Sequence, residues 1–242
     1  MRTGILIVGS LWWDTREERT KWREESLLLK EAIRVKAPLR YSRRSQSRGG
    51  TFTMVLSTTG GYGEALIVPC RNEASTLDAL VTEAEHLWAA EQPGAAAGSI
   101  SAAWGSVGVR FRDESVACYV VEGWADHFAN NGKAVPPITT TGKLNIPWPF
   151  SGTTDAVTTL DLILATATQA ESTPSTPEKV ADAWIEQDEG QEAYFFENVR
   201  YGIRTPEDVA IWRRIEQRKP EWLSNSQYSD VVEILRAEAS SV

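Results

Sequence analysis

The chain contains 242 residues, of which 42% are hydrophobic and 24% are charged, and its formal net charge is −8. This composition predicts a folded protein with one large domain, or one small domain with a substantial extension. The acidic balance argues against broad binding to nucleic acids or anionic membranes, which requires a surplus of Lys and Arg. No apolar run has membrane-spanning length, and the amino-terminal residues do not have the pattern of a signal peptide, so we expect a cytoplasmic protein.

Cysteine and histidine are scarce, which limits the chemistry open to this chain. Cys70 and Cys118 are the only cysteines, and His86 and His127 are the only histidines. Two isolated cysteines in a chain without an export signal are more often reduced core residues than a disulfide. Neither histidine has a second ligand at metal spacing, so the sequence argues against a zinc site and against a Ser-His-Asp triad.

The first predicted element is a strand over residues 5–8, followed by a tight turn. Four β-favouring apolar residues without polar alternation indicate a strand buried on both faces. Gly9 allows a sharp turn, and the N–H groups of Ser10 and Leu11 are then available to an anionic or carbonyl oxygen. Trp13 follows and belongs either to the core or to the wall of a pocket. The alternative is a core strand that simply ends at a Gly-Ser turn.

A basic stretch comes next in this acidic chain. Residues 15–25 predict a short helix or a solvated loop, and residues 32–37 alternate apolar and charged side chains as in a half-exposed strand, which Pro38 interrupts. Residues 39–50 are rich in serine and arginine and end in two glycines. Arginine presents a planar fork suited to carboxylates, whereas the alternative is a solvated strand and turn. The arginines concerned are Arg40, Arg43, Arg44 and Arg48.

Two strands and a helix follow the basic stretch. Residues 51–57 and 64–70 predict strands that pair as a hairpin around a glycine-rich turn. Ser75 then stands as an N-cap, and apolar residues at helical spacing continue until Pro93 and Gly94 end the helix. Three acids on or beside this helix are candidates for a catalytic carboxylate: Glu83, Glu85 and Glu91.

The remaining chain changes from strands to helices. We predict a strand over residues 103–111, a strand or a helix start over residues 117–121, and a buried strand over residues 160–168. A linker rich in Ser, Thr and Pro leads to a helical region. The order predicts an α+β arrangement. The helices are expected over residues 177–187, 191–201, 206–218 and 228–239.

Three motifs give the first half of the chain a resemblance to the γ-glutamylcyclotransferase superfamily, including its ChaC-like and AIG2-like branches. The first resembles the Tyr-Gly-Ser-Leu loop and trailing tryptophan of the family, the second its basic stretch, and the third the apolar, apolar, glutamate spacing at the end of its helix. The first departs from the family because valine replaces the tyrosine. The motifs are Val8-Gly9-Ser10-Leu11 with Trp13, Tyr41-Ser42-Arg43-Arg44 with Arg48-Gly49, and Ala84, Leu87 and Glu91.

The resemblance implies a fold and a reaction. It implies a small mixed β-barrel over residues 1–122, on which residues 123–242 pack as an extension that contributes one or two strands and the C-terminal helices. The family cyclises a γ-glutamyl group to 5-oxoproline and releases the attached amine, without metal or organic cofactor. Glu91 corresponds to the catalytic base, with Glu85 and Glu83 as alternative placements. The implied substrate-binding residues are Val8, Gly9, Ser10, Leu11, Trp13, Arg43 and Arg48.

Other functions remain open on the same fold. The missing tyrosine and the large helical extension favour a protein that binds a small γ-glutamyl-type ligand without turning it over. A protein-interaction role is a further alternative, for which the C-terminal helices offer aromatic side chains, although residues at helical spacing are more often internal packing. These aromatic residues are Trp184, Phe195, Phe196, Trp212 and Trp222. The sequence specifies no oligomeric state.

Overall fold

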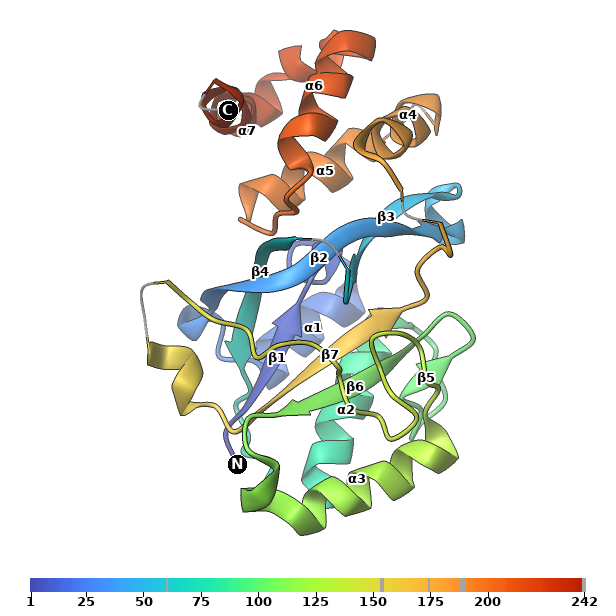
Figure 1. Cartoon of the computed structure of the whole chain (residues 1–242), viewed down its shortest axis with the longest axis vertical. Coiled ribbons are helices and arrows are strands. Elements are labelled where there is room, and N and C mark those ends of the chain that lie inside the picture. Colours follow the sequence, from blue (N-terminus) through green and yellow to red (C-terminus); the bar gives the residue numbers. More distant parts are fainter. Residues whose placement is uncertain (60, 153–154, 174, 188–189, 241–242) are drawn as a thin grey trace.

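A computed structural model describes residues 1–59, 61–152, 155–173, 175–187 and 190–240. Its centre is a seven-stranded mixed sheet with the strand order β3-β2-β4-β1-β7-β6-β5, which helices cover (Figure 1). The mixture of a sheet with separate helices confirms the predicted α+β class. The strands are β1 (Thr3–Ile7), β2 (Ile33–Ser45), β3 (Thr51–Leu56), β4 (Tyr62–Pro69), β5 (Ser101–Ala102), β6 (Gly105–Phe111) and β7 (Leu162–Thr168).

Strand β1 lies in the middle of the sheet and is buried on both faces, as its unbroken apolar sequence predicts. It pairs antiparallel with β4 and parallel with β7. Ile5 and Ile7 have no exposed surface. A strand that feeds a parallel neighbour requires a long crossover, and here the whole segment between β1 and β7 provides it. The predicted strand over residues 160–168 is therefore central to the sheet, although it follows the first strand by more than 150 residues.

The predicted hairpin between residues 51–57 and 64–70 is wrong, because both strands pair with β2 instead of with each other. Strand β2 has 13 residues. Its first half, as far as Pro38, pairs with β4, and its second half, from Leu39, pairs with β3. Pro38 has no N–H to donate, and it lies where β2 changes partners. The proline thus marks a change of pairing within one long strand and not its end.

The sheet is open in the described part of the chain, so it does not form the small mixed β-barrel that the resemblance implies. Strands β3 and β5 are its two edges, and no ladder joins them in the described part of the chain. Strand β2 contains an irregularity between Tyr41 and Arg43. Such irregularities increase strand twist, and β3 approaches β7 without pairing with it. The sheet therefore curls round a concave face without closing.

Three helices cover the sheet body. They are α1 (Glu17–Ser26), α2 (Leu77–Glu91) and α3 (Cys118–Asn131). The N-cap of α2 is Thr76, whose hydroxyl accepts a hydrogen bond from the Ala79 N–H at 3.2 Å, so the predicted cap at Ser75 is wrong by one residue. The segment 117–121 proves to be a helix start, and residue 122 lies within α3.

Both cysteines are free; Cys70 is buried as expected, but Cys118 is exposed.

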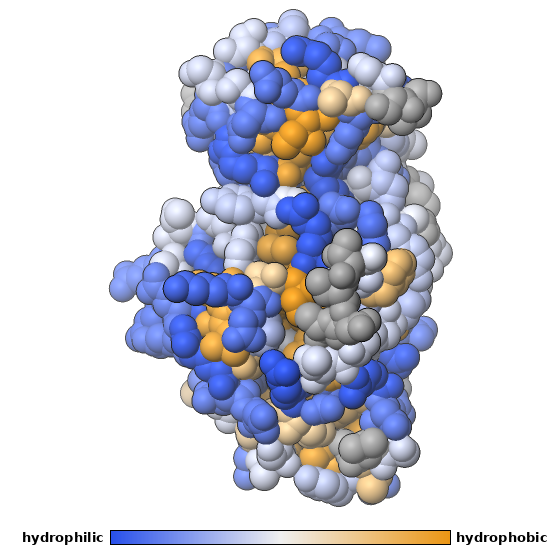
Figure 2. Space-filling view, turned by 90° about the vertical axis from the view of Figure 1, so that its left-hand side faces the viewer, coloured by the Kyte–Doolittle hydropathy of each residue, from blue (hydrophilic) through white to orange (hydrophobic). Residues whose placement is uncertain are grey.

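Four further helices form a C-terminal lobe at the β3 edge of the sheet (Figure 1). They begin and end close to the predicted residues. On the face seen in Figure 2, hydrophilic residues surround smaller hydrophobic patches. The five aromatic side chains considered as contacts for a protein partner are buried in the lobe. None of the helices in the described part of the chain combines the length and the hydrophobicity that a membrane span requires. The helices are α4 (Pro177–Gln187), α5 (Gln191–Arg200), α6 (Asp208–Arg218) and α7 (Ser229–Ala239).

Short 3-10 helices connect several of these elements. Two of them matter for the site below: η1 (Gly9–Leu11), which follows β1, and η3 (Gln46–Arg48), which connects β2 to β3. The others are η2 (Leu29–Glu31), η4 (Glu114–Ala117), η5 (Asp155–Thr159), η6 (Pro220–Ser224) and η7 (Ser226–Tyr228).

Candidate functional site

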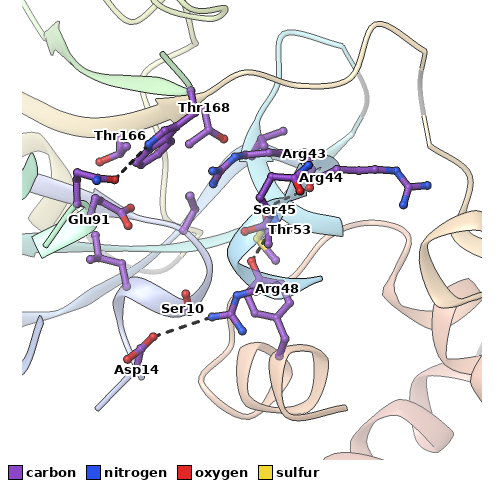
Figure 3. A pocket seen from close by; sticks show the side chains of 18 of the residues that line it. Ser10, Asp14, Arg43, Arg44, Ser45, Arg48, Thr53, Glu91, Thr166 and Thr168 are labelled. Carbon is purple, nitrogen blue, oxygen red and sulfur yellow. Dashed lines mark hydrogen bonds and ion pairs between the residues drawn. The ribbon is translucent and has the colours of Figure 1, made fainter. Parts of the chain in front are cut away.

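A cavity of about 910 Å³ lies at the carboxyl ends of the parallel strands β1 and β7. The two strands pair only as far as Ile5 and Leu164. Beyond that point β1 turns into η1, whereas β7 continues to Thr168, and the cavity lies between them and the β2–β3 connection (Figure 3). Carboxyl ends of adjacent parallel strands are common ligand sites in α/β sheets. Its polar lining includes Ser10, Asp14, Arg16, Arg19, Arg43, Arg44, Arg48, Thr53, Glu91, Gln92, Thr166, Thr168 and Tyr194.

The turn after β1 forms one wall of the cavity. Val8, Ser10 and Leu11 line it. Gly9 has φ +66°, and a Cβ at this position would lie 2.9 Å from the Tyr194 hydroxyl oxygen. The first N–H groups of a helical turn have no partner within the turn, and no side chain caps η1. These groups are therefore suited to a carbonyl oxygen or an anion, which is the role that the sequence analysis proposed for them.

Arg19, on α1, connects this turn to Glu91. Its Nη1 donates to the Ser10 Oγ at 2.9 Å, and its Nη2 donates to the Glu91 Oε2 at 2.7 Å. The Nε donates to the Ala90 carbonyl oxygen at 3.1 Å, which fixes the guanidinium plane. Arg19 is only 5% exposed. The serine hydroxyl and the carboxylate are thus held on either side of one buried cation.

Only one of the three candidate acids lines the cavity. Glu91 does so, and its side chain keeps 17% of its surface exposed. Glu83 is buried outside the cavity. Burial raises the pKa of Glu83, although the charge of His86 and hydrogen bonds from Asn72 and Cys70 act to lower it. Glu85 is half-buried and lies near the backbone of Gly98, also outside the cavity. The geometry therefore favours Glu91 over both alternatives.

Five arginines but only two acids line the cavity. Asp14 forms an ion pair with Arg16 at 2.9 Å. Burial alone would raise the pKa of Asp14, but the hydrogen bonds from Arg16 and the charge of Arg19 prevail and lower it, so Asp14 is ionised at neutral pH. Arg44 pairs with Glu171 at 2.9 Å and points away from the cavity centre (Figure 3).

The two arginines that were predicted to bind substrate, Arg43 and Arg48, both line the cavity. Arg43 stacks over the Trp104 ring at 4.5 Å from its centroid and has no ion pair among the described residues. Figure 3 shows its guanidinium turned toward the side where Glu91 and Thr166 lie. Arg48 stacks over the Tyr194 ring at 4.6 Å, and its closest acid oxygen, on Asp14, is 4.0 Å away. Burial lowers the pKa of both guanidinium groups, which favours pairing with an anion.

Trp13 is not among the residues that line the cavity, so its predicted contact with substrate is not seen. Its indole Nε1 donates to the Asn198 Oδ1 at 2.7 Å, and its ring meets the Tyr194 ring edge-on at 6.0 Å between centroids. Trp13 therefore joins the turn after η1 to helix α5 of the C-terminal lobe.

Several lining residues were not singled out in the sequence analysis, among them Thr166, Thr168, Arg19 and Tyr194. Thr166 and Thr168 lie on one face of β7, and their buried hydroxyls have no hydrogen-bond partner in the described structure. The alternation of threonine and alanine in β7 was a signal for them, because it places both hydroxyls on one face. Arg19 and Tyr194 had no comparable signal, since a charged helix and an aromatic helix usually indicate surface and core.

The described residues contain no group of three or more His, Cys, Asp or Glu side chains that is placed to hold a metal ion. Comparisons of the chain with protein-family models, with curated proteins and with solved structures found no match.

Proposed function

We propose that this protein cyclises a γ-glutamyl amine or peptide to 5-oxoproline. One observation carries the proposal: Glu91 and the Gly9–Leu11 turn border the same cavity and are connected through Arg19. The cyclisation requires a proton acceptor and hydrogen-bond donors that border the cavity in which the substrate reacts.

The reaction joins the α-nitrogen of the substrate to its own γ-carbonyl carbon. The α-amine attacks in its neutral form, and the Glu91 carboxylate accepts the proton that the nitrogen loses. Negative charge develops on the carbonyl oxygen, where the N–H groups of the turn stabilise it. The bond between the γ-carbon and the attached nitrogen then breaks, and Glu91 returns its proton to this nitrogen. The products are 5-oxoproline and the free amine.

Binding the substrate in a folded shape is mainly a matter of orientation. The α-carboxylate of a γ-glutamyl group suits the guanidinium groups of Arg43 and Arg48, because an arginine–carboxylate pair forms two parallel hydrogen bonds. Holding the carboxylate at one end leaves the α-amine free to approach the γ-carbonyl.

The test is a product assay with two matched variants of helix α2. The purified protein is incubated with a panel of γ-glutamyl amides, amino acids and peptides, and 5-oxoproline is measured by chromatography. Glu91→Gln keeps the size of the side chain but removes the base, so we expect a loss of about 100-fold to 10,000-fold in kcat. Glu85→Gln, on the same helix but outside the cavity, should retain activity. Full activity of Glu91→Gln would contradict the proposal.

A second candidate function is ligand binding without turnover. The ion pair between Glu91 and Arg19, at 2.7 Å, favours it, because this contact already engages the Glu91 Oε2 with a partner inside the protein. This function predicts saturable binding of γ-glutamyl compounds by calorimetry and no 5-oxoproline from any of them. In that case Arg43→Met should weaken binding, and Glu91→Gln should have a smaller effect on affinity.

A further inference from the structure

Arg48 reaches the cavity from the β2–β3 turn, and a residue of the C-terminal lobe holds it there. The Tyr194 ring, on α5, lies beneath the Arg48 guanidinium at 4.6 Å. The Tyr194 hydroxyl accepts a hydrogen bond from the Met54 N–H on β3 at 3.0 Å. Tyr194 is 3% exposed. The protein therefore packs around the rest of the ring and fixes it in place beneath Arg48. An arginine that rests on a fixed aromatic face has fewer conformations to lose when it binds an anion.

The turn that carries Arg48 also rests on the lobe at two further points. The Thr51 hydroxyl lies 3.1 Å from the Gln191 Oε1, at the start of α5. A Cβ at Gly49 would lie 2.7 Å from the Gln187 Oε1, at the end of α4. Gly49 has φ +64°, which glycine adopts without strain. The lobe therefore contacts Arg48 itself and the two positions Gly49 and Thr51 that closely follow it.

We propose that the C-terminal lobe completes the binding site: Tyr194 positions Arg48 to bind an anionic group of the ligand, so that ligand binding and packing of the lobe on the sheet stabilise each other. This inference deepens the proposed function, because it concerns the same cavity, and it assigns a role to a part of the chain that the three sequence motifs do not cover. Tyr194 acts through Arg48 and is a positioning residue.

The first test is a double-mutant cycle on ligand affinity, measured by calorimetry with 5-oxoproline and with the γ-glutamyl compounds of the panel above. Arg48→Met should weaken binding about tenfold or more, since it removes a charged bidentate partner. Tyr194→Leu should weaken binding about threefold to tenfold by freeing Arg48. In the Arg48→Met background, Tyr194→Leu should have no further effect, because its effect passes through Arg48.

Two controls separate positioning from a general loss of structure. Tyr194→Phe keeps the ring and loses only the hydroxyl, so it should restore the affinity that Tyr194→Leu loses. Tyr201→Leu removes an exposed tyrosine next to the same helix and should leave affinity unchanged. A Tyr194→Leu effect that is equally large with and without Arg48 would overturn the inference, as would an unchanged affinity.

Hydrogen exchange on the unaltered chain provides a test that does not depend on the Tyr194 variants folding. Addition of 5-oxoproline or of a bound γ-glutamyl compound should slow exchange in α5, and Arg48→Met should abolish this protection. Unchanged exchange in α5 at saturating ligand contradicts the inference. If the compounds bind and the effects of Arg48→Met and Tyr194→Leu are coupled, but no 5-oxoproline forms, the proposed cyclisation is wrong and the inference on Tyr194 stands. If 5-oxoproline forms but the effects of the two substitutions are additive, the cyclisation stands and the inference on Tyr194 is wrong. Failure of every compound to bind overturns both.

Discussion

At the scale of single residues, Gly9 is the most constrained position of the site. Its φ of +66° strains any residue with a side chain, and a Cβ would lie 2.9 Å from the Tyr194 hydroxyl oxygen. We expect Gly9→Ala to lower the free energy of unfolding by about 1–3 kcal/mol and to reduce ligand affinity. Gly50→Ala is the matched control, because Gly50 has φ +78° but nothing within 4 Å of the added Cβ. Urea unfolding of both variants measures the difference, and equal losses would show that the contact with Tyr194 contributes nothing.

The sequence could predict those site residues that belong to a recognisable local pattern. A Gly-Ser pair directly after a buried strand predicts a tight turn, and an acid at the end of a helix departs from local preference. The structure brings Ser10 and Glu91 to one cavity. Arg19 was not predictable, because its burial depends on Ala90 and Glu91, which lie more than 70 residues further along the chain. Single-residue patterns carry no information on such distant partners.

At the scale of elements, helix α2 places similar acids in different surroundings. Glu91 borders the cavity, whereas Glu83 is 4% exposed and its Oε2 has no hydrogen-bond partner among the described residues. Burial raises the pKa of Glu83. A carboxyl group with a higher pKa in the folded state binds its proton more tightly there, so the folded state gains stability as the pH falls through this raised pKa. Above it, the buried charge destabilises the fold.

Glu83→Gln should therefore increase the free energy of unfolding near neutral pH. The gain over the unaltered protein should shrink as the pH falls below the raised pKa of Glu83, where both side chains are neutral. Urea unfolding across this pH range measures it, with the half-buried Glu85→Gln as the control that should show little change. A gain that is constant with pH would mean that the charge of Glu83 is not its cause.

The elements themselves were predictable where the pattern is local. The helices of the lobe follow from apolar spacing and from Pro, Thr and Ser near their starts, and β1 follows from its apolar run. The pairing of β3 and β4 was not predictable from their short glycine-containing connection. A hairpin is the local solution, but the 13 residues of β2 are long enough to pair with both strands. Strand pairing is decided by such distant contacts, which a turn motif does not record.

At the scale of the whole molecule, Arg204 connects the sheet to the C-terminal lobe. Its backbone N–H and carbonyl oxygen exchange hydrogen bonds with Glu64 on β4 at 2.9 and 2.8 Å. Its guanidinium pairs with Asp208 on α6 at 2.7 Å and with Glu238 on α7 at 2.6 Å. Asp208 is only 1% exposed, so Arg204 provides the charge that compensates a buried carboxylate. The sheet and two helices of the lobe thus meet at one residue.

We expect Arg204→Met to lower the free energy of unfolding by about 3–5 kcal/mol, because it leaves the Asp208 carboxylate buried without its partner. Arg214→Met, also on the lobe, is the matched control: Arg214 pairs with Asp182 at 2.7 Å, but both side chains are about one quarter exposed, so solvent screens the pair and its loss should cost much less than the loss of Arg204. Adding Asp208→Asn to Arg204→Met should recover part of the loss, since it removes the uncompensated charge. The measurement is the free energy of unfolding in urea of the unaltered protein, of the two single arginine variants and of the double variant. Similar losses for Arg204→Met and Arg214→Met would show that burial of Asp208 does not determine how firmly the lobe is attached, and the lobe would then depend on its apolar contacts with β3.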